Sequence, residues 1–143
     1  MVLEKVKNKV IVINKNYTSK VISKIIKLLK DNKIIIMPSD TIYGFFSLPT
    51  QENKLRQIKR RDNKPFLYLI SNLNQLKILN IDLRHYKFIL EKYWPDPITF
   101  ILKQDKNRTI GVRMPKWDIL QRIINDVGFP LISTRSVKPI GLR

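Results

Sequence analysis

Two short stretches of this sequence gather side chains that could bind an anionic ligand. The first, residues 59–65 (KRRDNKP), lies between a predicted helix and a predicted strand. Such a loop could place Lys59, Arg61 and Lys64 around a triphosphate, because a guanidinium donates to two oxygens at once and each ammonium acts as a compact charge. A solvated basic connector would carry the same residues in a lysine-rich chain, so this stretch alone does not decide between the two interpretations.

The second stretch, residues 38–44 (PSDTIYG), follows an apolar segment at residues 34–37. It places three hydroxyl groups and a carboxylate at the end of what should be a buried strand, where α/β folds usually bind ligands. Ser, Asp and Gly are also common in ordinary turns, and Tyr43 could instead cover the core. Both interpretations stay open for this stretch as well.

The sequence excludes several kinds of catalytic site. It has no cysteine, which rules out disulfides and thiol nucleophiles, and with a single histidine, His85, we expect neither a histidine metal cluster nor a Ser-His-Asp triad. Its four glycines do not form a Walker loop or a dinucleotide fingerprint. A bound nucleotide would therefore depend on cationic side chains, and we predict no metal site built by the protein.

The net charge favours a polyanionic partner. There are 28 Lys and Arg residues against 11 Asp and Glu, which gives a formal charge of +17. Nucleic acid or nucleotides would suit such a chain. Codon usage in an AT-rich genome would also raise the lysine content, and the charge is spread along the chain rather than concentrated in one block.

The elements that must position these stretches alternate along the chain. Apolar β-branched runs predict strands, and apolar residues recurring every three or four positions predict helices. We predict strands at residues 9–14, 34–37, 66–70, 98–103, 109–114 and 131–134, and helices at residues 18–30, 52–58, 73–79, 84–93 and 120–127. Thr18 or Ser19 should cap the first helix, and Gly128 should end the last one.

This order predicts an α/β (α+β) fold, since strands and helices interleave. The short polar link at residues 104–108 predicts an antiparallel hairpin, so the sheet should be mixed. We expect residues 1–143 to form a single domain. No apolar run approaches the roughly 20 residues that cross a bilayer, and no signal-like stretch follows the N-terminal lysines, so we expect a cytoplasmic protein without a membrane partner.

Four elements, taken in order, resemble the YrdC-like family. That family carries Pro-Thr-Asp-Thr-Val-Tyr-Gly, a Lys-x-Arg element before a proline, Trp-Pro-Gly-Pro-Leu-Thr and Val-Ala-Val-Arg-Val-Pro. The corresponding residues here are 38–44 (PSDTIYG), 59–65 (KRRDNKP), 94–99 (WPDPIT) and 110–115 (IGVRMP). The similarity runs from about residue 34 to the C-terminus, and the shared order of four elements argues against coincidence.

The chain departs from the family at a fifth element. Where the family has Ser-Thr-Ser-Ala-Asn-x-Ser-Gly, residues 133–141 read STRSVKPIG, so the asparagine is lost and one residue is inserted. Ser133 and Thr134 still match, but Arg135 replaces a small serine and could either fill the nucleotide cavity or contact a phosphate. Asp96 replaces a glycine and Ser39 a threonine, and the chain ends earlier than family members usually do.

The resemblance implies a twisted open sheet of mixed parallel and antiparallel strands, flanked by helices around a basic cavity that holds ATP and L-threonine. The threonine-binding residues that it implies are Thr41, Tyr43, Lys64, Arg113 and Ser133, with Arg113 at the carboxylate. The nucleotide-binding residues that it implies are Lys59, Arg61, Thr109 and Arg135. Lys59 and Arg61 are also the implied catalytic residues.

The implied activity is that of an L-threonylcarbamoyladenylate synthase, a nucleotidyltransferase acting on L-threonine, bicarbonate and ATP. Mg²⁺ held by the phosphates would assist, and a tRNA threonylcarbamoyl transferase complex would use the product to modify tRNA. The reaction needs no cysteine or histidine, because the carbamate nucleophile is already an anion. The alternative is a catalytically impaired family member that binds double-stranded RNA or tRNA, which the charge and the altered residues 133–141 would suit.

Overall fold

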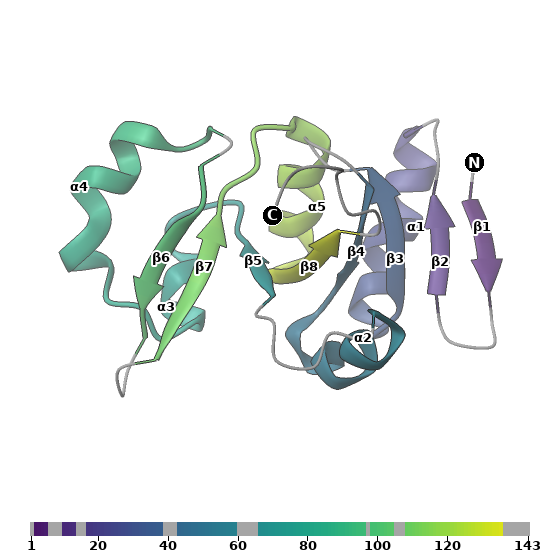
Figure 1. Ribbon diagram of the computed structural model, residues 1–143. Helices are drawn as coiled ribbons and strands as arrows, with labels where there is room; N and C mark the ends of the chain where they lie inside the picture. The colour runs from purple at the N-terminus through teal and green to yellow at the C-terminus, as the bar shows by residue number, and fades with distance from the viewer. Residues whose placement is uncertain are drawn as a thin grey trace, which may run out of the picture.

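The computed structural model describes residues 2–5, 10–13, 17–38, 43–59, 66–96, 98–104 and 108–135, with only the backbone described at residues 2–5, 10–13, 38, 43, 59 and 135. Eight strands within these ranges form one sheet in the order β1-β2-β3-β4-β8-β5-β7-β6. The strands are β1 Val2–Lys5, β2 Val10–Ile13, β3 Ile34–Pro38, β4 Tyr43–Ser47, β5 Leu67–Leu69, β6 Phe100–Lys103, β7 Thr109–Arg113 and β8 Leu131–Arg135. Figure 1 shows the N-terminal strands at one end of the sheet and the β6–β7 hairpin at the other.

The sheet is mixed and open, as predicted. The pairs β2–β3 and β5–β7 are parallel. The pairs β1–β2, β3–β4, β4–β8, β5–β8 and β6–β7 are antiparallel. The last strand in sequence, β8, lies in the interior of the sheet between β4 and β5. Its position brings the end of the described chain beside strands that occur early in the sequence.

Five helices flank this sheet in the described part of the chain. They are α1 Ser19–Lys30, α2 Glu52–Lys59, which follows the 3-10 turn Pro49–Gln51, α3 Gln75–Ile78, α4 Leu83–Tyr93 and α5 Asp118–Val127. The predicted caps of α1 and α5 are confirmed. Thr18 accepts a hydrogen bond from the backbone N of Val21 at 3.2 Å, and Gly128 ends α5 with a φ of 87°.

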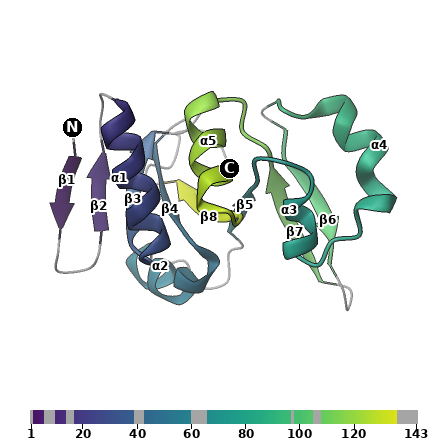
Figure 2. The same cartoon turned by 180° about the vertical axis from the view of Figure 1, so that it is seen from behind.

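Helices α1 and α5 lie side by side on one face of the sheet (Figure 2). Their apolar sides pack against β3, β4, β5 and β8, through strand residues that alternate along each strand. Helix α2 packs with Ile34, Phe45 and Ile132, which are the alternate residues of their strands. Around α3 and α4 a third cluster includes Leu102, Ile110 and Val112 of the β6–β7 hairpin.

Two strands differ from the sequence prediction. The predicted first strand is the second, because β1 precedes it. For the stretch 38–44 a ligand-binding strand end and an ordinary turn were both left open and no second strand was predicted, but a strand, β4, begins at Tyr43 and runs to Ser47. Phe45 and Phe46 of β4 are both buried, so neither face of this strand is polar and the alternation that marks a strand is missing.

Candidate functional site

Stretches 38–44 and 133–135, which are far apart in the sequence, meet in the middle of the sheet. Gly44 of β4 pairs with Arg135 of β8, and Phe46 pairs with Ser133. A Cβ atom on Gly44 would lie 3.0 Å from the carbonyl oxygen of Thr134 and 3.3 Å from the Oγ of Ser133. A larger residue here would force the neighbouring strand to shift by a few tenths of an ångström, so Gly44 favours the close contact between these two stretches.

Ser133 belongs to a row of paired residues that crosses the sheet. In register, Phe46 pairs with Ser133, Ser133 with Leu67, Leu67 with Gly111, and Gly111 with Ile101. Paired residues on neighbouring strands point to the same side of the sheet. The row therefore joins Ser133 and Gly111, from two of the family elements, on one face.

This face is packed under helices at one end of the row and exposed at the other. Phe46 has no exposed area and belongs to the cluster beneath α1 and α5. Gly111 is half-buried and Thr109 is exposed, while Ile101 keeps 69 % of its area exposed. A strand isoleucine this exposed marks a part of the sheet that no described helix covers.

Arg113 lies at the border between the packed and the exposed part. It is the last residue of β7 and pairs with Leu69 of the covered cluster, and only 7 % of its area is exposed. Its position two residues after Gly111 puts it on the same face as Gly111 and Ser133. A guanidinium largely removed from water interacts strongly with an anion, since the local dielectric is low.

Thr109 shares this face but lies at the other end of β7. It lies four positions before Arg113, which corresponds to about 13 Å along a strand. Its side chain is exposed, and it pairs with Lys103 of β6. The two residues could therefore contact only different ends of one extended ligand.

The element at residues 94–99 lies beside the same row. The indole Nε1 of Trp94 donates a hydrogen bond to the carbonyl oxygen of Ile98 at 2.8 Å, which closes this turn on itself. A Cβ atom on Gly111 would lie 3.4 Å from the methyl group of Thr99. The structure thus brings together residues from four of the five family elements, around Gly44, Thr99, Gly111 and Ser133.

Several predicted site residues cannot be placed. Thr41, Arg61 and Lys64 lie outside the described residues. The backbone of Tyr43 pairs with Pro38, and Lys59 is the last residue of α2, but the side chains of Tyr43, Lys59 and Arg135 are not described. The roles assigned to all of the predicted site residues stay predictions, as does the basic cavity.

Helix α2 carries an arginine that the sequence analysis did not consider. Arg56 pairs with Glu52 at 2.9 Å, and its guanidinium lies 4.7 Å from the ring centroid of Phe66. Nearby, burial raises the pKa of Tyr68, and the charge of Glu52 raises it further, so this phenol stays protonated at neutral pH. Arg56 precedes Lys59 by one helical turn, and that spacing could have been noticed in the sequence.

The described residues hold no group of three or more His, Cys, Asp or Glu side chains that could bind a metal ion. In the same part of the chain, no helix is long and apolar enough to cross a membrane.

Comparison with known proteins identifies relatives along most of the chain. The Sua5/YciO/YrdC family profile, described as "Telomere recombination", matches residues 27–140. The threonylcarbamoyl-AMP synthase of Haemophilus ducreyi is 26 % identical over 129 residues, which span 77 % of this chain and 68 % of that protein. A putative threonylcarbamoyl-AMP synthase of Methanocaldococcus jannaschii is 30 % identical over 131 residues, which span 82 % of this chain and 63 % of that one.

Solved structures agree on the fold. Sua5 of Pyrococcus abyssi, determined in complex with L-threonine, superposes with a TM-score of 0.71 at 20 % identity. The matched region covers 87 % of this chain and 41 % of the Sua5 chain. YciO of Escherichia coli, an uncharacterised protein, has a TM-score of 0.66 at 24 % identity, with 86 % of this chain and 67 % of that one covered. The chain thus spans less than half of the Sua5 protein and about two thirds of its shorter relatives. From the profile match and the shared mixed sheet, we conclude that this chain belongs to the Sua5/YciO/YrdC family.

Proposed function

We propose that this protein is an L-threonylcarbamoyladenylate synthase, which forms threonylcarbamoyl-AMP and pyrophosphate from L-threonine, bicarbonate and ATP. The observation that carries the proposal is the convergence of the family elements on one face of the sheet, around Ser133, Gly111 and the buried Arg113. The choice of this reaction is supported by the relatives named threonylcarbamoyl-AMP synthase.

The proposed binding roles divide along β7. Arg113 would hold the threonine carboxylate, because a guanidinium fork matches two carboxylate oxygens. Ser133, together with Thr41, Tyr43 and Lys64, would complete the threonine side. Thr109 at the other end of β7 would contact the nucleotide, whose remaining proposed ligands are Lys59, Arg61 and Arg135.

The proposed reaction requires orientation and charge neutralisation. The threonine amine and bicarbonate first give a carbamate, with loss of water. A carbamate oxygen then attacks the α-phosphorus of ATP, forming a new P–O bond while the bond to the leaving pyrophosphate breaks. Lys59 and Arg61 would stabilise the charge that builds up on the phosphate oxygens. Mg²⁺ favours phosphate oxygens and water as ligands, so the nucleotide would supply most of its ligands.

The test is a pyrophosphate-release assay with purified protein, ATP, bicarbonate and L-threonine. We expect release that depends on threonine, with a mixture lacking threonine as the background. An Arg113→Lys variant should raise the threonine concentration needed, whereas Arg122→Lys, at a half-exposed position on α5, should behave like the unsubstituted protein. Absence of threonine-dependent release at high protein concentration would reject the proposal.

A second function has its own support. The charge of +17 and the altered residues 133–141 would also suit a family member that binds tRNA or double-stranded RNA without catalysis. RNA affinity that falls steeply with salt, together with ATP binding undetectable by calorimetry, would favour this function.

For the synthase we propose a cytoplasmic location and delivery of its product to a tRNA threonylcarbamoyl transferase complex.

A further inference from the structure

The outer surface of α4 carries a stripe of residues that the proposed synthase reaction does not use. Phe88 keeps 88 % of its area exposed, the highest value among the exposed large apolar residues of the described chain. Arg84 and Lys92 lie four residues before and after it, so the three side chains follow one line along the helix. Leu90, on the opposite side of the helix, is fully buried. We call Arg84, Phe88 and Lys92 the α4 stripe.

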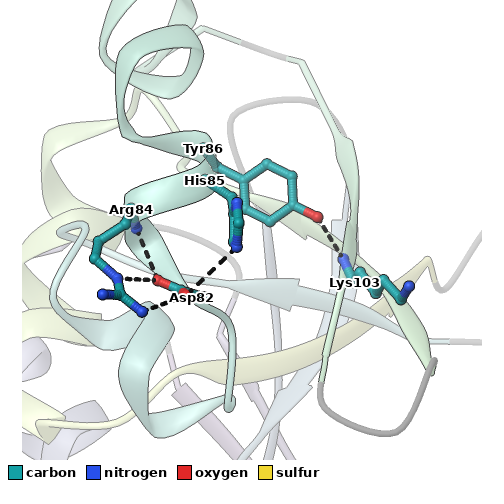
Figure 3. Close-up of polar contacts among 5 residues, drawn as sticks. All are labelled: Asp82, Arg84, His85, Tyr86 and Lys103. Atoms are coloured by element: carbon teal, nitrogen blue, oxygen red, sulfur yellow. Dashed lines mark hydrogen bonds and ion pairs between the residues drawn. The ribbon is translucent and has the colours of Figure 1, made fainter.

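The start of the stripe is held in place by a polar cluster (Figure 3). Asp82 caps α4 by accepting a hydrogen bond from the backbone N of Arg84 at 3.0 Å. Its two carboxylate oxygens also accept from the Nε and Nη2 of Arg84, at 3.1 and 3.0 Å. The guanidinium is thereby oriented in advance while 90 % of its side chain stays exposed.

The helix itself is fixed to the sheet next to the stripe. The hydroxyl of Tyr86 accepts a hydrogen bond from the backbone N of Lys103, on the edge strand β6, at 3.3 Å (Figure 3). Trp94, directly after α4, packs edge-on against Phe100 of β6 with ring centroids 5.4 Å apart. The helix that carries the stripe is therefore anchored to the sheet, so a partner would not have to order its backbone.

The chemistry of the stripe suits a single-stranded polynucleotide. A base can stack on an exposed phenyl ring and on a flat guanidinium, and such stacking contributes about 1–3 kcal/mol per base. Phosphates between the bases would meet Lys92 and the neighbouring Lys87. Apart from the buried Arg113, the described part of this end of the molecule, residues 71–114, has six basic residues, at 77, 84, 87, 92, 103 and 108, against three acidic ones, at 82, 91 and 96. Its charge is thus complementary to a polyanion.

An apolar protein partner fits the stripe less well. Phe88 is flanked along the helix by Arg84, Lys92 and the exposed Glu91, and the nearby Ile89 and Tyr93 expose 45 % and 39 % of their areas. Protein interfaces bury contiguous apolar surface and have few charged residues at their centre. An exposed aromatic ring beside basic side chains instead suits the stacking of a base.

We propose that the α4 stripe binds a single-stranded segment of RNA, with a base stacked on Phe88 and the flanking phosphates on Lys87 and Lys92. The choice of RNA over DNA rests on the proposed function, whose product serves tRNA modification. The position of the stripe, on the outer side of α4, makes it a contact separate from the candidate synthase site at Ser133 and Arg113.

The test is fluorescence anisotropy with a labelled oligouridylate, measured at several salt concentrations, with an oligodeoxythymidylate of equal length in parallel. Phe88→Ala should weaken binding of the oligouridylate at least fivefold, the lower end of the stacking range. Phe129→Ala is the matched control, because Phe129 is also exposed, at 52 %, but lies after α5. Lys87→Gln and Lys92→Gln should each reduce the slope of log affinity against log salt concentration by about one, the contribution of one phosphate contact. Lys24→Gln, at an exposed position on α1, should not.

Three outcomes would overturn the proposal. One is equal loss of affinity in Phe88→Ala and Phe129→Ala, and another is tighter binding of the deoxy strand. The third is a monomer–dimer equilibrium, measured by sedimentation, that Phe88→Ala abolishes without changing RNA affinity, because the stripe would then bind a second copy of the chain. Thermal denaturation checks that each variant is folded. Pyrophosphate release is measured without RNA, so failure of either proposal can be distinguished from failure of the other.

Discussion

The two ends of one sheet face differ in what they pack against. We call the part of this face on β3, β4 and β8 beneath α1 and α5 the covered half, and the part on β7 and β6 with Thr109, Gly111 and Ile101 the open half. The covered half is closed by aliphatic side chains and supplies stability. In the open half, Thr109 and Ile101 are exposed and Gly111 is half-buried, so a ligand can bind there without displacing core side chains.

The largest effect should come from removing a large side chain in the covered half. Phe46→Ala takes away a phenyl ring with no exposed area, and such truncations cost about 3–5 kcal/mol of unfolding free energy. Ile101→Ala, in the open half, removes a side chain that is 69 % exposed, and we expect a change within about 0.5 kcal/mol. Urea denaturation measures both. Similar losses in the two variants would show that the open half is packed as well.

The next effect should appear at the border of the two halves. Arg113→Lys keeps the charge but loses the guanidinium fork, and a hydrogen bond to a charged group contributes about 1.5–3 kcal/mol. We therefore expect threonine to bind about 10- to 100-fold more weakly, measured by calorimetry. Unchanged affinity would show that Arg113 does not bind the threonine carboxylate and has a role in packing alone.

The two glycines of this face should respond differently to an added methyl group. At Gly44 the new Cβ would lie 3.0 Å from a backbone oxygen, which cannot move aside, and overpacking of this kind costs about 1–3 kcal/mol. At Gly111 the new Cβ would lie 3.4 Å from the methyl group of Thr99, close to an ordinary contact. Gly111→Ala should change the unfolding free energy by less than about 1 kcal/mol. Equal losses of unfolding free energy in the two alanine variants, measured by urea denaturation, would contradict the difference in space around the two glycines.

Much of this fold could be predicted from local patterns. The apolar spacing and the caps at Thr18 and Gly128 predicted α1 and α5 to within a residue or two, and the short polar link predicted the β6–β7 hairpin. The family resemblance, carried by four short elements, is confirmed by the profile match over residues 27–140. These features depend on neighbours in sequence or on recognisable motifs.

The rest depends on pairings between distant residues. β4 was missed because Phe45 and Phe46 are both buried, so the strand lacks the alternation of a half-exposed strand. The row from Ser133 to Ile101 exists only because β8 lies between β4 and β5, and nothing in the local sequence around residue 131 indicates that position. The exposure of Phe88 could likewise not be predicted, since the sequence does not show which side of this helix faces the solvent.

The smallest effect concerns the helix that backs the open half from the other side of the sheet. The hydrogen bonds from Arg84 hold the pKa of the Asp82 carboxyl below its usual range. A lowered folded-state pKa means that the carboxylate stabilises the fold above its unfolded pKa of about 3.9 and loses this contribution as the pH falls through the folded value. Asp82→Asn keeps a capping side chain but removes the charge. Thermal melts of the two proteins should therefore differ slightly from pH 5 to pH 7, and the difference should shrink below about pH 4. A difference that persists at pH 2 would assign the effect to cap geometry, and the guanidinium of Arg84 would then owe its orientation to something other than the charge of Asp82.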